Sequence, residues 1–530
     1  MSHIWQSTFP YTEGTRAMLQ EEALGGARRW PDRVALVDAT DGRSLTYGEI
    51  ADGAQRLAGG LLAGGARQGD VLAVVAGNAP GVVIVAHGAL LAGLTLAPAS
   101  ALLTARELGA FLRQTGARYV VADAAAMPRV NEAACAAAVQ AVFALGALPS
   151  ADPIVAEGGD PDAIALLMST SGTSGLPKSA AHTHAGAVAT LRQYAASPPR
   201  RFGPDDVVAG VVPFAHMFGW VMLNSALRAG ARMVTLARFE LEAFLRMIQD
   251  HRVSTAAVVP PVAHALARHP AVERYDLSSL RFLIVGAAPC PAEIERECEA
   301  RLGCVVGQGL GMTEAAPIAL PESQVCHGST GRLVPGTQAM IVDPDTGERL
   351  GEGATGELWF RGPQLMSGYL GDAAATAATI DAEGWLHSGD VGHFDADGNL
   401  FLVDRLKELI KVRGYQVAPA QLEAELTAHP AVADAAVVPR PDEESGEVPV
   451  AYVALCEPAE PGAIAAWVAE RVAPYKRLAD VIVVDAIPRA PTGKLLRRVL
   501  VERERAAVGR PTASVAQARP MRGGLSFTPR

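Results

Sequence analysis

Short apolar runs alternate with longer segments rich in Ala, Leu and Arg along most of the chain. Runs such as Val71–Val75, Tyr119–Val121 and Phe282–Val285 have the length and continuous hydrophobicity of buried strands. Because the segments between them have helical character, the alternation predicts α/β layers with parallel strands. The longest apolar stretch, 81–98, contains a His, two interior Gly and a Thr. It predicts a buried helix followed by a buried strand, because a membrane span needs about 20 predominantly apolar residues.

The pattern changes near residue 400, where a basic, strand-like segment, Leu406–Gly414, precedes a shorter β/α pattern that ends at about residue 498. We therefore predict a large N-terminal domain over 1–405 and a small α+β C-terminal domain over 406–500. Residues 510–530 contain four arginines, three prolines and no acidic residue. This composition predicts a flexible tail over 501–530.

The composition narrows the class of protein. The chain has 530 residues, 49% of them hydrophobic and 19% charged, as is typical of a globular protein with a large core. Its net charge of −10 disfavours nucleic-acid binding, because no overall basic field is present. The six cysteines form no CxxC pair, and the N-terminus lacks a signal-peptide pattern. We expect a soluble cytoplasmic protein that does not bind membranes.

A loop rich in Ser and Gly, 169–178, follows the apolar run Ala163–Met168. Small residues let backbone amides approach an anion, hydroxyl groups add donors, and Lys178 supplies a point charge. An ordinary surface turn is the alternative, but the preceding strand and the Pro-Lys pair favour a phosphate-binding loop. The usual P-loop requires Gly before the Lys, where this chain has Pro177, so a mononucleotide kinase or GTPase is disfavoured.

A second glycine-rich segment, 307–312, argues against a dehydrogenase. Read from Gly309, the GxGxxG pattern ends on Glu314, so the segment does not match the dinucleotide-binding fingerprint. A Rossmann dehydrogenase thereby loses its main support.

The segment Thr170–Lys178 resembles the phosphate loop of the adenylate-forming ligases, which include acyl- and aryl-CoA synthetases, peptide-synthetase adenylation domains and luciferases. Further segments occur in the order of that family: Pro213–His216, Gly309–Glu314, Gly356–Gly362, Gly384–Asp390, Asp404–Lys411 and Pro491–Lys494. The resemblance covers about residues 30–498, and 407–423 is most similar to the 4-coumarate CoA ligase branch.

The resemblance implies a large domain of layered α/β subdomains, a small mobile domain, and a reaction that uses ATP, Mg²⁺ and CoA. A carboxylate would attack the α-phosphorus of ATP, with cations offsetting the charge of the phosphates and of the leaving pyrophosphate. The nucleotide-binding positions implied are Ser171, Gly172, Thr173, Ser174, Gly175, Lys178, Gly309, Leu310 and Thr313, with Asp390 and Arg405 on the ribose. Glu314 and Thr173 would contact the metal ion, and Lys494 would be the main catalytic residue of this first half-reaction.

The second half-reaction, attack of a thiol on the acyl-adenylate, implies rotation of the small domain about Lys407. Gly414 and His216 would line the pantetheine tunnel, and Lys411 and Gln416 would lie near the active centre. Alternative roles remain open. Gly414 could be a turn glycine, His216 could be a pocket histidine, and Lys407 and Lys411 could belong to a solvated basic face. Asp390 could likewise be a turn residue.

The substrate class is narrowed by residue type. No carboxylate lies in 213–219 to pair with an amine, which disfavours an amino acid substrate. The presumed acyl pocket is apolar and suits an aryl or bulky polycyclic acid, with tight packing below the site as the alternative. Its residues are Met217, Trp220, Val285, Gly286, Ala287, Gly311, Met312, Ala316 and Ile318.

Three positions depart from the branch: Leu310 stands where Tyr usually stacks on adenine, Ser179 follows the loop lysine in place of Gly, and Ser169 replaces a Tyr. Loss of an aromatic stack removes about 1 kcal/mol, close to tenfold in nucleotide affinity. One alternative is therefore an enzyme that only thioesterifies an acyl-adenylate supplied by a partner enzyme. A catalytically idle nucleotide- or acyl-binding relative is a third reading, and a carrier-protein thiol is an alternative acceptor. Local sequence does not determine the oligomeric state.

Overall fold

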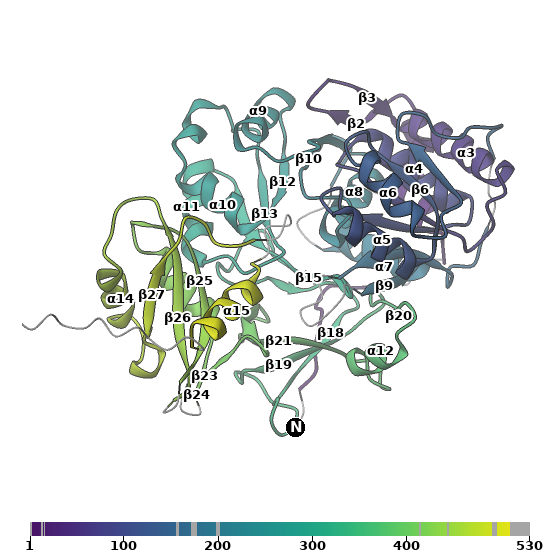
Figure 1. Ribbon diagram of the computed structural model, residues 1–530. Helices are drawn as coiled ribbons and strands as arrows, with labels where there is room; N and C mark the ends of the chain where they lie inside the picture. The colour runs from purple at the N-terminus through teal and green to yellow at the C-terminus, as the bar shows by residue number, and fades with distance from the viewer. Residues whose placement is uncertain are drawn as a thin grey trace, which may run out of the picture.

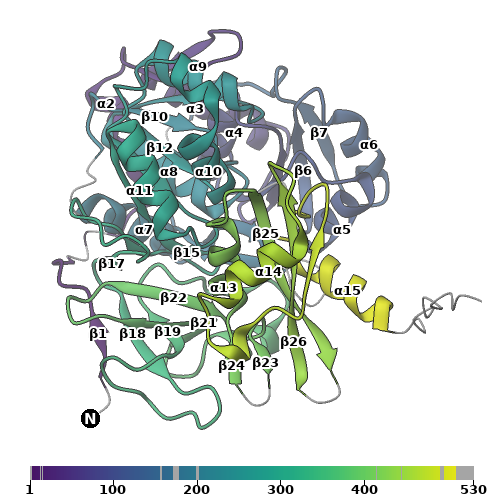
Figure 2. The same cartoon turned by 90° about the vertical axis from the view of Figure 1, so that its left-hand side faces the viewer.

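The computed structural model describes residues 3–11, 14, 16–154, 158–170, 178–197, 202–412, 415–442, 445–489 and 495–508. A large N-terminal body lies beside a smaller C-terminal one, drawn in light green and yellow in Figures 1 and 2. The predicted positions Ser171, Gly172, Thr173, Ser174, Gly175, Gly414 and Lys494 lie outside the described residues.

Two seven-stranded sheets form the frame of the large domain, and most of their ladders are parallel, as predicted. The first sheet has the order β20 (Gly368–Tyr369), β9 (Ser179–Thr183), β8 (Ile164–Ser169), β5 (Thr95–Ala99), β4 (Val71–Val75), β6 (Ala117–Ala122) and β7 (Ala141–Ala144). The second sheet has the order β14 (Val305–Gln308), β13 (Phe282–Val285), β12 (Thr255–Val258), β10 (Val207–Gly210), β11 (Arg232–Thr235), β2 (Val34–Asp38) and β3 (Ser44–Thr46).

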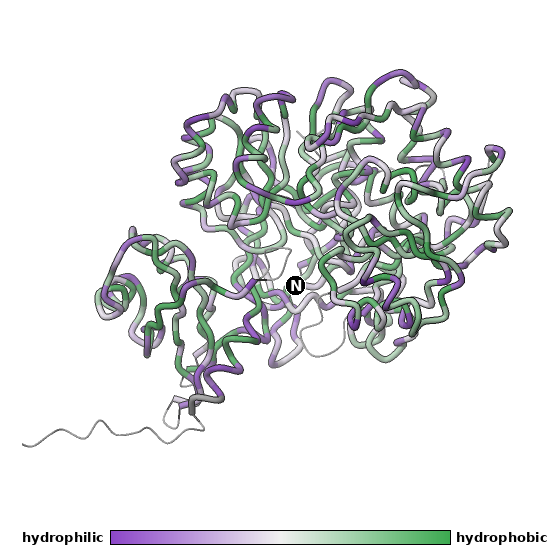
Figure 3. Tube along the Cα trace, turned by 45° about the horizontal axis from the view of Figure 1, so that its top comes forward, coloured by the Kyte–Doolittle hydropathy of each residue, from purple (hydrophilic) through white to green (hydrophobic). Residues whose placement is uncertain are grey.

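Helices fill the space between these sheets and cover their outer faces. Between the sheets lie α3 (Tyr47–Ala63), α4 (Pro80–Leu91), α7 (His184–Ala196) and α8 (Met217–Ala229), whose buried residues share one core with strands of both sheets. The outer faces are covered by α5 (Ala105–Thr115) and α6 (Met127–Cys135) on one sheet and by α9 (Leu241–His251), α10 (Pro260–Arg268) and α11 (Ala292–Leu302) on the other. The stretch 81–98 is therefore a buried helix followed by β5, as predicted. Figure 3 shows the hydrophobic stretches inside and hydrophilic stretches along the outer turns.

A smaller antiparallel unit completes the large domain. One sheet has the order β1 (Trp5–Gln6), β18 (Gln338–Val342), β19 (Gly356–Arg361), β21 (Leu386–Phe394) and β22 (Leu400–Arg405). Beside it lie β15 (Leu310–Met312), β16 (Ala315–Leu320) and β17 (Arg332–Leu333). The short helices α1 (Leu19–Ala23) and α2 (Gly25–Arg29) pack against α8 of the large domain, and α12 (Ala373–Thr379) packs against β20 and β21.

The small domain is one sheet covered by three helices. Its strands are β24 (Tyr415–Val417), β23 (Ile410–Val412), β26 (Gly446–Leu455), β25 (Val432–Asp442) and β27 (Asp480–Val483), and its helices are α13 (Pro419–Thr427), α14 (Pro461–Ala469) and α15 (Arg497–Val508). The last strand of the large-domain sheet ends at Arg405, and β23 already belongs to the small sheet.

The C-terminal tail does not begin at residue 501, because α15 continues to Val508. Leu500 is fully buried, and the buried Glu504 accepts hydrogen bonds from Tyr452 and Arg440 of the small sheet. The composition of residues 510–530 gave no information on 501–508, where Glu504 pairs inside the domain. Residues 509–530 lie outside the described part of the chain.

Among the described residues, we find no helix that combines the length and the apolar character required to cross a membrane.

Candidate active site

The base of the predicted phosphate loop is held by two adjacent antiparallel strands. β8 ends at Ser169 and β9 begins at Ser179, and these two residues are paired across the ladder. The Thr170 amide donates to the Lys178 carbonyl over 2.8 Å, and the Lys178 amide donates to Thr170 Oγ1 over 3.3 Å. Thr170 and Lys178, which flank the predicted loop, are thus held next to each other at the edge of this strand pair.

The Lys178 side chain is held over an aromatic ring. Its Nζ lies 4.8 Å from the centre of the Tyr369 ring and 3.9 Å from the Asp372 carboxylate. Tyr369 reaches this position because β20 pairs with β9, with Tyr369 opposite Ala180. The Lys178 side chain is 43% exposed, so its ammonium group is held in place yet accessible to a phosphate.

Thr313 and Glu314 lie in the turn between β15 and β16, and both are anchored by the neighbouring sheet. The buried His182 on β9 donates from Nε2 to the Thr313 carbonyl over 2.8 Å. Burial lowers the pKa of His182 to about 4, so the ring is neutral at pH 7. Tyr369 Oη donates to Glu314 Oε1 over 2.6 Å, and the Met366 amide donates to the Glu314 carbonyl over 2.8 Å.

Asp390 and Arg405, the predicted ribose-binding pair, face each other in the β21–β22 ladder. Arg405 Nε donates to Asp390 Oδ1 over 3.1 Å, and the Asp390 side chain is buried. The predicted hinge residue Lys407 follows directly. Partial burial and the Arg405 charge lower the pKa of Lys407, whereas the charges of Glu408, Asp390 and Glu314 act in the opposite direction. Lys407 is therefore within electrostatic reach of both Asp390 and Glu314.

His216 and the acyl-pocket candidates come from three elements that converge beside this turn. His216 precedes α8, and burial lowers its pKa, which favours a neutral ring. The first turn of α8 packs closely on the preceding loop, because a Cβ on Gly219 would lie 2.2 Å from the Pro213 carbonyl oxygen. A Cβ on Gly286, at the end of β13, would lie 3.0 Å from the Phe218 ring.

The structure divides the nine acyl-pocket candidates into two groups. Six are buried, and the side chains among them pack into hydrophobic clusters: Met217, Trp220, Val285, Gly286, Ala316 and Ile318. Three are at least partly accessible: Ala287, Gly311 and Met312. Ala287 has a φ of 71°, a conformation that costs a non-glycine residue about 1 kcal/mol and that is concentrated at functional sites.

Gly309 and Leu310 connect β14 to the Thr313–Glu314 turn. The Gly309 amide donates to the Val285 carbonyl over 3.0 Å. Leu310 is 8% exposed and packs with Ile318 and Leu386 in the core of the antiparallel unit. The aliphatic side chain at this position contributes to the core, whereas the tyrosine of the branch is expected to stack on adenine.

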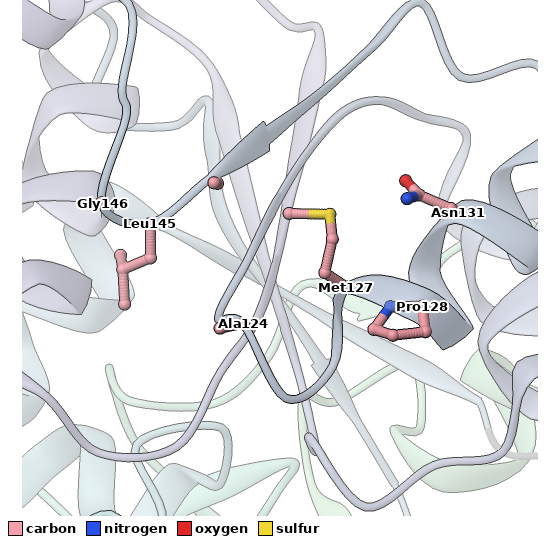
Figure 4. A pocket seen from close by; sticks show the side chains of 7 residues that line it. Ala124, Met127, Pro128, Asn131, Leu145 and Gly146 are labelled. Carbon is pink, nitrogen blue, oxygen red and sulfur yellow. The ribbon is translucent and has the colours of Figure 1, made fainter.

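One cavity lies away from these residues. It has a volume of about 690 Å³ and lies between α6 and the end of β7, where Met127, Pro128 and Leu145 line it (Figure 4). In the first sheet, β7 is the edge strand opposite to β20, which carries Tyr369. This cavity is therefore separate from the candidate active site.

The predicted CoA-side residues of the small domain are not brought to the site. Lys411 and Gln416 are opposite each other in the β23–β24 hairpin, and the Lys411 amide donates to Glu447 Oε2 over 2.9 Å. In both Figure 1 and Figure 2 this hairpin lies at the end of the small domain that points away from β15.

Three residues of the site were missed from the sequence: His182, Tyr369 and Asp372. Tyr369 lies in Ser367–Leu370, a segment with no charged residue, and its contact with Lys178 spans 191 positions along the chain. Only the pairing of β20 with β9 reveals it. A histidine two residues before the helix start at His184 resembles any buried strand histidine, so His182 gave no signal of its own.

The residues present fit a magnesium ion that arrives with a nucleotide. Over the residues that the structure describes, no group of three or more His, Cys, Asp or Glu side chains is placed to hold a metal ion. Magnesium in such sites uses one or two carboxylates and completes its shell with phosphate oxygens and water. Glu314 matches this requirement because its carboxylate is partly exposed. Its hydrogen-bond partner Tyr369 also contacts Lys178.

A lysine next to the predicted phosphate loop, a carboxylate suited to magnesium and a carboxylate–guanidinium pair near the domain junction are the features expected of a two-domain enzyme that uses a nucleotide. The model of the AMP-binding enzyme family matches residues 25–370, and that of the AMP-binding enzyme C-terminal domain matches 421–494. The chain belongs to the AMP-binding enzyme family.

Curated relatives and solved structures agree with this assignment. The chain is 37% identical to 4-coumarate–CoA ligase 3 of Oryza sativa subsp. japonica, with 97% of each chain covered, and 37% identical to 4-coumarate–CoA ligase of Pinus taeda, with 95% and 98% covered. A benzoate CoA ligase from Burkholderia xenovorans LB400 has a similar structure, with a TM-score of 0.81, 26% identity and 91% and 99% of the two chains covered. The predicted fold and the predicted class, an AMP-forming acid–CoA ligase, are confirmed.

Proposed function

We propose that this protein converts a bulky or aromatic carboxylic acid to its CoA thioester through an acyl-adenylate, with ATP cleaved to AMP and pyrophosphate. The observation that carries the proposal is a set of two polar groups in the large domain: Lys178 and Glu314, which both contact Tyr369, and the paired Asp390 and Arg405. The first group would bind phosphate and metal, the second would bind ribose, and the apolar residues of α8 and β13 would face the acid.

In the first half-reaction, Lys178 binds the β- and γ-phosphates together with Ser171, Gly172, Thr173, Ser174 and Gly175, and Thr313 contacts the α-phosphate. Glu314 and Thr173 would hold magnesium, which would supply positive charge against the phosphates. Asp390 binds the ribose hydroxyls, and Arg405 orients that carboxylate through the 3.1 Å hydrogen bond. Lys494 stabilises the charge that develops as the anhydride forms.

The acyl group lies against Ala287, Gly311 and Met312, which the structure leaves accessible, with Met217, Trp220 and Ile318 behind them. No carboxylate in 213–219 pairs with an amine, so an aryl or polycyclic acid is favoured over an amino acid. A neutral His216 lies between the acyl group and the incoming thiol.

In the second half-reaction, the small domain rotates about Lys407 and presents the β23–β24 hairpin to the site. Lys411 and Gln416 then approach the acyl-adenylate, and Gly414 leaves room for the pantetheine arm. The position of the hairpin, away from β15, supports a rotation because its residues are out of reach in the present arrangement. Free CoA in the cytoplasm is the acceptor.

Paired reactions test the proposal. A panel of aryl, fatty and polycyclic acids is incubated with ATP, Mg²⁺ and CoA, and their preformed adenylates are incubated with CoA alone; acyl-CoA is measured by mass spectrometry. Product in both reactions is expected. Absence of acyl-CoA from both reactions would contradict the proposal.

Thioesterification alone is the second candidate, and the core packing of Leu310 favours it, because the position supplies no ring for adenine. Product from the adenylates alone would establish this candidate and a partner enzyme that supplies them. An unchanged ATP affinity in Leu310→Tyr would show that Leu310 is not the cause.

A further inference from the structure

We propose that Tyr369 is a positioning residue that orients the Glu314 carboxylate toward a nucleotide-bound magnesium ion and fixes the Lys178 ammonium beside it. This inference rests on the proposed function. Its basis is one side chain with two contacts: the Tyr369 hydroxyl donates to Glu314 Oε1 over 2.6 Å, and the ring face lies 4.8 Å from Lys178 Nζ.

The hydroxyl contact has the geometry of a strong hydrogen bond. A distance of 2.6 Å lies within the range of about 2.5–2.7 Å typical of a hydroxyl donating to an ionised carboxylate. With Oε1 held, the rotation of the carboxylate is restricted and Oε2 keeps a defined direction. The main chain of Glu314 is held as well, by the Met366 amide, and that of Thr313 by His182.

The contact with the Tyr369 ring positions the ammonium group of Lys178. A cation within about 6 Å of an aromatic centre is attracted to the ring face. The Asp372 carboxylate also lies near this ammonium group, 3.9 Å from Lys178 Nζ. One tyrosine thus sets the positions of the carboxylate and of the ammonium group that act on the same phosphate chain.

The fold makes Tyr369 rigid. Tyr369 belongs to β20, which pairs with β9, and its amide donates to Thr376 Oγ1 over 2.8 Å. Ser367 adds a second tie to β9, because its hydroxyl donates to the Ala181 carbonyl over 2.9 Å. β9 also carries His182 and begins directly after Lys178. This strand therefore positions Lys178, His182 and, through its pairing with β20, Tyr369.

Calorimetric binding of α,β-methylene-ATP with and without Mg²⁺ tests the role without requiring turnover. Tyr369→Phe, which keeps the ring, is expected to raise the Kd of the Mg²⁺ complex about tenfold, because a hydrogen bond to a charged group is lost. The Kd of the metal-free nucleotide is expected to change less than twofold. Tyr369→Leu is expected to raise the metal-free Kd about threefold as well, because the ring face is lost.

Tyr275→Phe is the matched control, because it removes a tyrosine–glutamate hydrogen bond, to Glu242 over 3.3 Å, at the surface of the second sheet. It is expected to leave both Kd values unchanged. The circular dichroism spectra of both Tyr369 variants are expected to match that of the unsubstituted protein, which shows that the variants are folded.

Equal shifts of both Kd values in Tyr369→Phe, or no shift in either, would overturn the positioning role. Failure of the proposed function has a different signature, in which the unsubstituted protein binds neither form of the nucleotide.

Discussion

The groups proposed for the two half-reactions are held in different ways. Lys178, Glu314 and Tyr369 are fixed against one another by strand pairing within the large domain. Lys411 and Gln416 lie on a hairpin of the small domain, away from that group. Ligands of ATP can therefore be preorganised, whereas the thiol-side residues depend on movement of a domain. The segment between Asp404 and Ile410 connects the two regions, and the predictions below act on either side of it.

The largest effect is expected where the small domain is tied to this segment. Arg497 at the start of α15, with 12% of its side chain exposed, pairs with Glu408 and with Glu423 of α13. Arg497→Met leaves two poorly solvated carboxylates unpaired, which costs about 3–5 kcal/mol. Thermal unfolding and amide hydrogen exchange of β25 and β26 measure the loss.

Arg498→Met is the matched control, because Arg498 is 73% exposed and pairs with Glu502 one turn further along the same helix. A melting temperature that falls equally in both variants would show that the Arg497 pairs are not what stabilises the small domain.

Glu314→Gln tests the preorganised ATP ligands of the large domain. The amide can still accept the Tyr369 hydrogen bond, but it loses the charge that magnesium requires, so ATP–pyrophosphate exchange is expected to fall about 100-fold or more. Acyl-CoA formation from a preformed adenylate should stay within twofold. Glu242→Gln, at the other tyrosine–glutamate pair, is the control. An exchange rate within threefold of the unsubstituted protein would remove Glu314 from the metal site.

Lys411→Ala tests the β23–β24 hairpin of the small domain, which must move to reach the site. We expect thioester formation from a preformed adenylate to fall about tenfold, equivalent to about 1.4 kcal/mol, while ATP–pyrophosphate exchange is unchanged. Lys476→Ala removes the same charge from the exposed turn that contacts Gln421 and should change neither rate. If exchange falls and thioester formation does not, the assignment of this hairpin to the second half-reaction is wrong.

The smallest effect is a pH dependence at the junction itself. Asp404 accepts hydrogen bonds from the amides of Arg405 and Ala420, and burial raises its pKa to about 6 from an ordinary value of 3.8. Between these values the folded state binds more protons than the unfolded state, so this residue increases stability as the pH falls. The contribution of Asp404 to the free energy of unfolding increases by about 1 kcal/mol from pH 7 to pH 5. Asp404→Asn should remove this part of the pH dependence in urea unfolding; an identical dependence in the variant would contradict the assignment.

Local patterns predicted much of the large domain. Continuous apolar runs identified β4, β6 and β13, because strands covered by helices on both faces are apolar throughout. The Asp390–Arg405 pair was also predicted, and the β21–β22 register places the two residues opposite each other. The start of the C-terminal tail was placed too early, because the charges of α15 are satisfied by residues that are distant in sequence.

By itself, the sequence determined the layered α/β architecture and the family, because hydrophobic periodicity and short motifs report local burial and local backbone geometry. The tertiary structure alone decided that Tyr369 joins Lys178 to Glu314, that Leu310 packs in a core, and that the β23–β24 hairpin lies away from β15. These relations depend on strand pairing and domain placement between segments far apart in the chain, and side-chain chemistry at one position does not encode them.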